Sequence, residues 1–437
     1  MHYRRHRRLV ELMAPLLVSA GLVLALTGCG EEKIQPNILL IVLDDFGYND
    51  LAINNGADSP TPTLDSIAAQ GIRFTRHYAE SSCTASRATL LTGMYAARVG
   101  AHPYFNGIDH ELVTLPDALG ALGYNRYMIG KWHTGDAHRE SHPQYQGFDH
   151  WFGFINQLYL RGPHDESGYQ RSRPTYRNPW LETETEGPRQ FEGHLTDILT
   201  DRALEVIEQE REPWFMYLSY YAPHTPIEPS KHFAAQFPAD AAGKYQALKA
   251  QLDSNIGRII TRLETSGELE DTMIIVVSDN GGTAKSWPSN LPFYGAKATY
   301  TEGGVRTPLL LRWPGRWPAG QVNNKVAMIF DIYPTILSAL AAPVPEQLDG
   351  TDLLALPTES QERELRWYSH GGYGDRYGML SADGQWRLDA RQGSTPQLIH
   401  EKNFVARQPL NEQEAHPEIA GAMRASMEEW IEPVTRV

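Results

Sequence analysis

The chain has 437 residues, of which 41% are hydrophobic and 21% charged, and its formal net charge at pH 7 is −14. This composition is typical of a globular protein and excludes disordered and fibrous classes, and the length suits a large α/β domain with a smaller second one. A chain this acidic is a poor ligand for nucleic acid, so no nucleic-acid partner is expected.

The amino terminus has the pattern of an export signal. Arginines cluster within residues 4–8, and the apolar run Leu12–Leu26 is too short to cross a bilayer as a mature helix. The following Leu26-Thr27-Gly28-Cys29 resembles the lipobox of bacterial lipoproteins. That resemblance implies removal of residues 1–28, lipidation of Cys29, and a tether over residues 29–35. We therefore expect a lipid-anchored protein of the bacterial cell envelope, on the outer membrane or in the periplasm. The alternative is an ordinary signal peptide with a chance cysteine.

Cys83 is the second of only two cysteines. With Cys29 in the anchor it has no disulfide partner. It precedes a predicted helix, Ser86–Leu91, and a helix amino terminus depresses the pKa of a thiol. Arg87 lies one helical turn further on, where it can face the same side. The alternative interpretation is a small buried cysteine, the commoner fate of a lone cysteine.

The first strand after the tether ends in two carboxylates. Asn37–Leu43 is an uninterrupted apolar run, which predicts a central parallel strand covered on both faces. Asp44 and Asp45 follow it directly, and two adjacent carboxylates repel each other unless a cation neutralises them. The next long strand, predicted over Asn125–Ile129, leads to Lys131 and His133.

Two further apolar strands also lead to polar groups. The run Pro213–Tyr221 is followed by His224, which lies between prolines. The run Thr272–Val277 is followed by Asp279 and Asn280, and Lys297 lies on a nearby loop.

The remaining segments surround these strands. Short strands are predicted over 72–74 and 308–312, and residues 144–193 are predicted to be a long loop with little regular structure. Helices are predicted over 62–70, 116–122, 195–209, 245–263 and 326–340. A catalytic domain over 36–345 is predicted to be followed by a subdomain over 346–437. In that subdomain we expect a strand at 366–370, a hairpin over 378–390 turning at Asp383-Gly384, and a helix over 417–431.

The residues that follow these strands share one predicted position, because functional groups collect at the carboxyl edge of a parallel sheet. The aspartates and Asn280 offer hard oxygen ligands, which suit Ca²⁺ or Mg²⁺. The chain has no cysteine and histidine spacing typical of a zinc site. The lysines, histidines and Arg87 add positive charge and proton-transfer groups. This combination favours hydrolysis of a sulfate or phosphate ester.

These motifs resemble the type I sulfatases, the arylsulfatase family of the alkaline-phosphatase-like superfamily. The family pattern is Cys-x-Pro/Ala-Ser-Arg with a glycine six residues after the arginine, and Cys83–Arg87 with Gly93 matches it. The resemblance extends from Pro36 to the carboxyl terminus. It implies an α/β fold with a mainly parallel sheet sandwiched by helices, followed by a smaller antiparallel sheet with one helix.

The same resemblance implies a cofactor chemistry. A maturase would oxidise Cys83 to Cα-formylglycine, used as the hydrated aldehyde, in a sulfuric ester hydrolase. Asp44, Asp45, Asp279 and Asn280 would hold a divalent cation, Ca²⁺ with Mg²⁺ as the alternative, and the residue at position 83 would be a further ligand. Ala85 stands where proline is commoner in the family, which leaves the identity of the maturase open.

The resemblance also implies roles for the basic residues. Lys131, Lys297 and His224 would bind the sulfate and assist departure of the alcohol. His133 would accept a proton from the hydrate, and Arg87 would orient the hydrate. The expected substrate is a sulfated carbohydrate, with activity on synthetic aryl sulfates.

Two alternatives remain open at this point. One is a phosphonate monoester or phosphodiester hydrolase with the same aldehyde. The other is a lipoprotein that binds sulfated glycans without catalysis.

Overall fold

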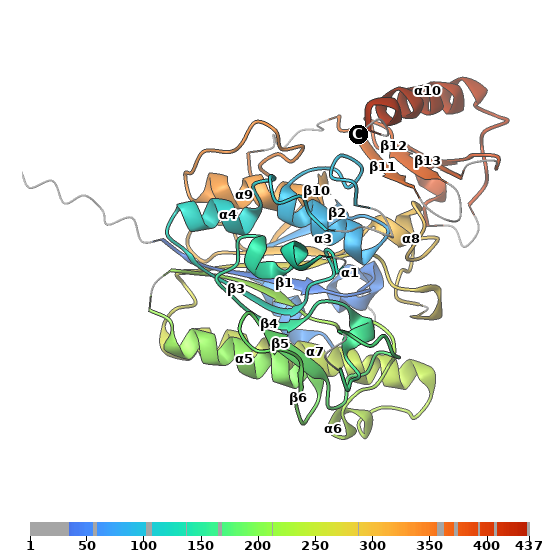
Figure 1. Cartoon of the computed structure of the whole chain (residues 1–437). Helices are drawn as coiled ribbons and strands as arrows, with labels where there is room; N and C mark the ends of the chain where they lie inside the picture. The colour runs from blue at the N-terminus through green and yellow to red at the C-terminus, as the bar shows by residue number, and fades with distance from the viewer. Residues whose placement is uncertain are drawn as a thin grey trace, which may run out of the picture. The chain divides into compact units, whose positions relative to one another are not determined.

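The computed structural model describes residues 35–434 except 56–58, 102–106, 137, 165–167, 212, 287, 356–361, 371–374, 392–393 and 406–408 (Figure 1). The predicted signal peptide and Cys29 lie outside these residues, so the lipid anchor stays a prediction. Within the described ranges, none of the helices combines the length and the apolar character needed to cross a membrane.

A mixed, mainly parallel sheet forms the centre of residues 35–437, which make one compact unit. Among the described residues it has ten strands in the order β10-β2-β9-β8-β1-β7-β3-β4-β5-β6. The strands are β1 (Asn37–Leu43), β2 (Ile72–Tyr78), β3 (Asn125–Lys131), β4 (His150–Phe154), β5 (Trp180–Thr183), β6 (Arg189–Gln190), β7 (Trp214–Ser219), β8 (Thr272–Ser278), β9 (Leu309–Arg312) and β10 (Gln321–Met328). Strand β1 pairs in parallel with β7 and β8, and β3 pairs in parallel with β7 and β4.

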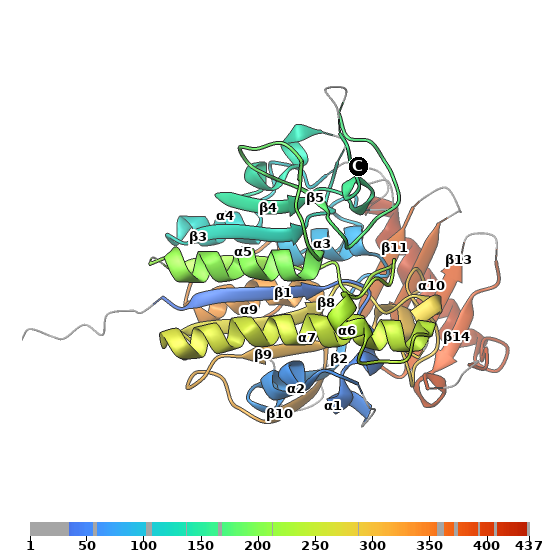
Figure 2. The ribbon, with the colours of Figure 1, turned by 90° about the horizontal axis from the view of Figure 1, so that it is seen from below.

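Helices cover both faces of this sheet (Figures 1 and 2). The helices of this part of the chain are α1 (Ala52–Asn55), α2 (Pro62–Ala69), α3 (Cys83–Thr92), α4 (Leu115–Ala121), α5 (Leu195–Gln209), α6 (Lys231–Ala234), α7 (Ala241–Ser266), α8 (Glu302–Val305) and α9 (Ile332–Ala339), of which α6 packs against α7. Successive side chains of a strand point to opposite faces. Ile38, Leu40 and Val42 of β1 accordingly share one hydrophobic cluster with α3, α4 and α9. Leu39 and Ile41 share the other with α2, α5 and α7. The α/β architecture expected from the sequence is confirmed.

A small antiparallel sheet follows, with strands β11 (Leu365–Ser369), β12 (Arg376–Leu380), β13 (Trp386–Arg391) and β14 (Gln397–His400) in that order. Helix α10 (Pro417–Val434) packs on one face, where Met379 and Leu388 meet Met423 and Met427. The hairpin turns through Gly384, whose φ of 71° lies in the left-handed region that glycine adopts without strain. The antiparallel subdomain with one helix is therefore confirmed, and the boundary at residue 345 stays a prediction.

Two local predictions are wrong. Residues 144–193 contain β4, β5 and β6, and β4 extends the parallel part of the sheet. Helix 326–340 is shorter than predicted, because Val326–Met328 pairs in parallel with β2 and helix α9 begins only at Ile332. In both cases pairing with a distant strand overrides the local pattern.

Candidate active site

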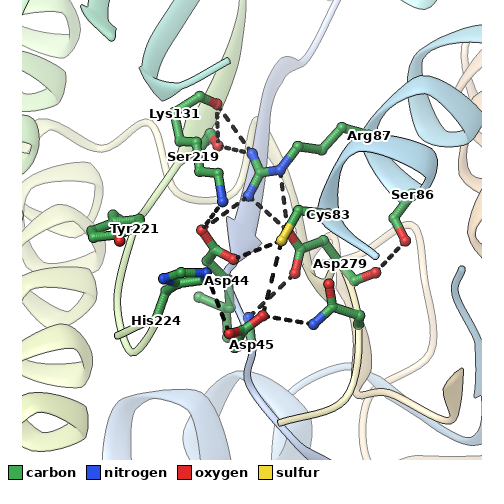
Figure 3. A network of polar contacts seen from close by, with 12 residues as sticks. Asp44, Asp45, Cys83, Ser86, Arg87, Lys131, Ser219, Tyr221, His224 and Asp279 are labelled. Carbon is green, nitrogen blue, oxygen red and sulfur yellow. Dashed lines mark hydrogen bonds and ion pairs between the residues drawn. The ribbon is translucent and has the colours of Figure 1, made fainter. Parts of the chain in front are cut away.

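The predicted site residues converge at one edge of the large sheet (Figure 3). Strands β8, β1, β7 and β3 are neighbours, so the chain segments that leave their carboxyl ends lie side by side. The residues brought together there are Asp44, Asp45, Cys83, Arg87, Lys131, His133, His224, Asp279, Asn280 and Lys297. The structure fixes where these residues lie, and the role of each stays a prediction.

Cys83 is the first residue of α3 and is 3% exposed. Its Sγ lies 3.3 Å from Asp44 Oδ1 and 3.9 Å from Asp45 Oδ1, and Lys297 Nζ donates to it at 2.9 Å. Burial, followed by the charges of Asp279 and Asp44, raises the pKa of this thiol. The depressed pKa expected from the helix amino terminus is wrong, because burial and, after it, the two carboxylates disfavour the thiolate. An unmodified Cys83 is therefore a poor nucleophile here.

Arg87 fixes the position of Asp279 behind Cys83. Its Nε and Nη2 donate to Asp279 Oδ2 at 3.1 and 2.8 Å, and its Nη1 donates to Ser219 Oγ and the carbonyl oxygen of Lys131. The guanidinium is fully buried and lies 3.7 Å from Asp44 Oδ2. The guanidinium of Arg87 thus contacts residues at the carboxyl ends of all four strands, β8, β7, β3 and β1.

Asp44 and Asp45, the two carboxylates after β1, each form an ion pair with a lysine. Lys131 Nζ lies 2.5 Å from Asp44 Oδ2, and Lys297 Nζ lies 2.5 Å from Asp45 Oδ1. Burial opposes ionisation of Asp44, but Lys131 and the neighbouring cationic groups hold its pKa well below the usual range. Burial and the adjacent Asp44 raise the pKa of Asp279 to about 6. Three carboxylates therefore face three cationic groups, Arg87, Lys131 and Lys297, and burial makes Asp279 harder to ionise than Asp44.

The donor set fits a hard divalent cation. Ligand atoms of Asp44, Asp45, Cys83 and His224 all lie within 4.8 Å of one another. Asp45 Oδ2 and Asn280 Oδ1 are buried without a hydrogen-bond partner, while Asn280 Nδ2 donates to Asp45 Oδ1 at 2.7 Å. Oxygen atoms of this kind are the ligands that Ca²⁺ and Mg²⁺ prefer.

Asp279 differs from the other predicted ligands. Its Oδ2 accepts from Arg87, and its Oδ1 accepts from the Asp45 backbone N–H at 3.2 Å. It lies outside the group of four that includes His224.

The backbone is unusual at three points around the site. Asp45, His133 and Ala298 adopt φ values of 61°, 58° and 69°. Left-handed conformations are uncommon for residues other than glycine, and they cluster at functional sites. Each of these residues either belongs to the predicted set or directly follows one of its members.

The two histidines lie in different surroundings. His224 Nε2 lies 3.5 Å from Asp45 Oδ2, and its Nδ1 contacts the Thr225 carbonyl oxygen at 2.7 Å. His133 Nδ1 is buried without a hydrogen-bond partner. Burial, reinforced by Lys131, lowers the pKa of His133 well below its ordinary value. His133 is therefore held in its neutral form.

Three residues that contact the predicted set were not predicted from the sequence. Ser219 Oγ accepts from Arg87 and donates to the Lys131 carbonyl oxygen at 2.7 Å. Ser86 Oγ donates to the Asp279 carbonyl oxygen. The Tyr221 ring stacks on His224 with 4.8 Å between centroids and lies 5.5 Å from Lys131 Nζ. The position of Ser219 and Tyr221 at the end of β7 was the available signal, because the neighbouring strands lead to site residues.

Several known proteins with similar sequences are named as sulfatases. Residues 36–342 match the family model described as Sulfatase. N-acetylgalactosamine-6-sulfatase of Mus musculus is 34% identical over 384 residues, which cover 81% of this chain and 72% of that protein. Arylsulfatase G of Mus musculus is 30% identical over 395 residues, which cover 79% of this chain and 74% of that protein.

The fold is also similar to solved structures. The crystal structure of Ps i-CgsB in complex with k-i-k-neocarrahexaose superposes with a TM-score of 0.80 at 26% identity. The superposition covers 91% of this chain and 93% of that one.

Proposed function

The chain belongs to the sulfatase family and is a sulfuric ester hydrolase, and from this premise we propose that its substrates are sulfated carbohydrates. Two relatives support this substrate class. One is named for an N-acetylgalactosamine 6-sulfate ester, and the other was solved with a neocarrahexaose. Activity on synthetic aryl sulfates is expected as well, since arylsulfatase G is also similar over most of the chain.

We propose that position 83 acts as formylglycine in the mature enzyme. The high pKa of the unmodified thiol supports this, because a thiol at this position would stay protonated. Converted to the hydrated aldehyde by a maturase, the residue supplies one hydroxyl as nucleophile and a second that can later expel sulfate. A bound Ca²⁺, or Mg²⁺, supplies charge that favours the deprotonated hydroxyl. Asp44, Asp45, Asp279 and Asn280 would hold that cation.

The basic residues bind the sulfate group and take part in proton transfer. Lys297 Nζ, which lies 2.9 Å from Cys83 Sγ, is placed to contact an oxygen of a sulfate against position 83. Lys131 lies on the other side of Asp44 and adds a second positive charge. Such fixed charges stabilise the negative charge that develops during transfer.

Arg87 would keep the residue at position 83 oriented. His224 would assist departure of the alcohol, and neutral His133 would accept a proton from the second hydroxyl.

One observation carries this proposal. The Sγ of a buried cysteine at a helix amino terminus lies between two aspartates and a lysine. A structural cysteine needs no such neighbours, whereas a hydroxyl nucleophile for a sulfate ester needs both a cation site and an anion site.

Mass spectrometry of the peptide that contains Cys83 tests the modification. In active protein from the native host we expect the mass of an aldehyde in place of the CH₂SH side chain. A fully unmodified thiol in protein that still releases sulfate would contradict the proposal.

We also propose that the enzyme is held at the cell envelope by lipid on Cys29. The signal-like pattern of residues 1–28 supports this. Cys29→Ala should move the protein from the membrane fraction to the soluble fraction without changing turnover. Unchanged membrane association would contradict the anchor.

A further inference from the structure

Three chain segments that carry predicted site residues contact one pair of buried residues, Ser289-Asn290. The first segment follows β1 and carries Asp44 and Asp45, the second follows β8 and carries Asp279 and Asn280, and the third is the loop 295–297, which ends in Lys297. Because the Ser289-Asn290 pair contacts all three segments, its side chains can set how the segments lie relative to one another.

Asn290 directs every hydrogen bond of its side chain to the backbone of two of these segments. Its Nδ2 donates to the carbonyl oxygens of Gly282 at 2.8 Å and Gly295 at 3.1 Å, and its Oδ1 accepts from the Gly282 N–H at 2.7 Å. Gly282 lies two residues after Asn280, and Gly295 lies two residues before Lys297. Only a side chain with both a donor and an acceptor can make these three bonds, as a carboxamide does.

The Gly282 carbonyl oxygen also holds the backbone of Lys297. The Lys297 N–H donates to this oxygen at 3.1 Å, and the next N–H, that of Ala298, donates to the Ser81 carbonyl oxygen at 2.8 Å. The backbone of Lys297 is therefore attached at two points. Asn290 fixes the first of them, because it binds both backbone polar groups of Gly282.

Ser289 makes a corresponding contact with the segment that follows β1. Its Oγ accepts from the N–H of Gly47, which lies two residues after Asp45, at 3.2 Å. The same Oγ donates to Asp50, a buried carboxylate that forms an ion pair with buried Lys249 at 2.9 Å. This ion pair anchors the Ser289-Asn290 pair to α7, the helix that carries Lys249.

The two segments with predicted cation ligands lie directly against the Ser289-Asn290 pair. A Cβ on Gly47 would lie 2.3 Å from the Ser289 carbonyl oxygen, and a Cβ on Gly282 would lie 2.3 Å from Ser289 Oγ. Atoms that are not bonded do not approach so closely, so both positions need glycine for the backbones to come together. A change in the Ser289-Asn290 pair therefore acts on these segments without an intervening layer.

We propose that Asn290 is a positioning residue that keeps Lys297 in place relative to the predicted cation ligands. It acts through the backbone of Gly282 and Gly295, which lie beside Asn280 and Lys297 in the chain. The inference rests on the proposed function in one respect, that Asn280 and the neighbouring aspartates hold a cation while Lys297 binds a sulfate oxygen.

Calcium binding to the metal-free enzyme, measured by calorimetry, tests the effect on the cation site without turnover. Asn290→Ala should weaken calcium binding by about ten- to a hundredfold, which is typical when a residue that orients metal ligands is removed.

Asn255→Ala is the matched control. Asn255 is as buried as Asn290, and its Nδ2 also donates twice, to Asp197 Oδ1 at 2.7 Å and the Gln251 carbonyl oxygen at 2.9 Å, between α5 and α7. The control should lower the melting temperature, because buried acceptors lose their donor, and should leave the calcium affinity unchanged.

A double-mutant cycle with Lys297→Met tests the effect on the lysine, at calcium concentrations that saturate each variant. With Lys297 present, Asn290→Ala should lower kcat/KM for 4-nitrophenyl sulfate by about tenfold. In the Lys297→Met background the same substitution should lower it by less than about twofold, because the group that it displaces is already absent. If Asn290→Ala shows no melting transition, Asn290→Asp, which keeps the acceptor and loses both donated bonds, is judged by the same cycle.

Equal losses of kcat/KM in the two backgrounds would overturn the proposal, and so would an unchanged calcium affinity in Asn290→Ala. An equal loss of calcium affinity in Asn255→Ala would overturn it as well, because lower stability would then explain both results. Failure of the wild type itself to bind calcium would overturn the proposed cation site, and the inference with it.

Discussion

Replacement of Arg87 by glutamine should destabilise the protein because it leaves Asp279 buried without its partner. The guanidinium is fully buried and donates twice to Asp279 Oδ2, at 3.1 and 2.8 Å. Breaking a buried ion pair of this kind costs about 3–5 kcal/mol, far more than the loss of an exposed pair. We expect a loss of this size in the free energy of unfolding at pH 8 in the presence of EDTA.

The loss should depend on pH in a defined direction. The pKa of Asp279 is already raised to about 6 in the folded protein. A carboxyl with a raised pKa stabilises the fold below its unfolded value and loses that contribution as pH rises through the folded one. Removing Arg87 raises the pKa of Asp279 further, so the difference between wild type and variant should be smaller at pH 5 than at pH 8.

Urea unfolding followed by tryptophan fluorescence measures both quantities. Arg202→Gln is the control, because Arg202 is only partly buried and its pair with Glu205 at 2.9 Å should contribute less than about 0.5 kcal/mol. An Arg87→Gln loss below about 1 kcal/mol, or one equal at both pH values, would refute the reasoning that Arg87 compensates Asp279.

Three other perturbations test separate parts of the account. Lys297→Met should lower kcat/KM for 4-nitrophenyl sulfate by about 10²–10³, because a fixed charge 2.9 Å from Cys83 Sγ is lost; an unchanged kcat/KM would exclude a direct role. Glu80 is 2% exposed, and burial raises its pKa from 4.5 to about 8. Between pH 4.5 and about pH 8, Glu80 keeps its proton in the folded state but loses it in the unfolded state. The free energy of unfolding therefore falls as pH rises. Glu80→Gln should make the fall in the free energy of unfolding between pH 5 and pH 8 smaller than in the wild type, and an equal fall in the variant would contradict the burial argument. Dialysis against EDTA should abolish turnover and added CaCl₂ should restore it, whereas full activity in metal-free protein would exclude the cation site.

The position of the site could be predicted because it requires only that the strands be parallel, and not their order in the sheet. Apolar runs such as Asn37–Leu43 mark buried parallel strands, and the polar residues that follow them must lie at one edge of the sheet. The structure places Asp44, Asp279 and Lys131 together at that edge for this reason.

Other features of the fold and of the site could not be predicted, because they depend on contacts between segments that are far apart in the sequence. The pKa of the Cys83 thiol could not be predicted from its helix position, because it is set by burial and by the charges of Asp279 and Asp44, which lie far away in the sequence. Residues 326–328 form a strand only because β2 lies alongside. The contact of Arg376 with Ala298 requires the small sheet to be placed on the large domain, and no local pattern encodes that.

Release of inorganic sulfate by the matured enzyme tests the central claim most directly. Incubation with 4-nitrophenyl sulfate should give sulfate and nitrophenol in equal amounts, and Cys83→Ala should give neither while its melting transition is kept. The wild type should hydrolyse bis(4-nitrophenyl) phosphate more slowly than 4-nitrophenyl sulfate. Sulfate release that persists in Cys83→Ala, or faster hydrolysis of the phosphate diester by the wild type, would contradict a sulfate ester hydrolase that works through position 83.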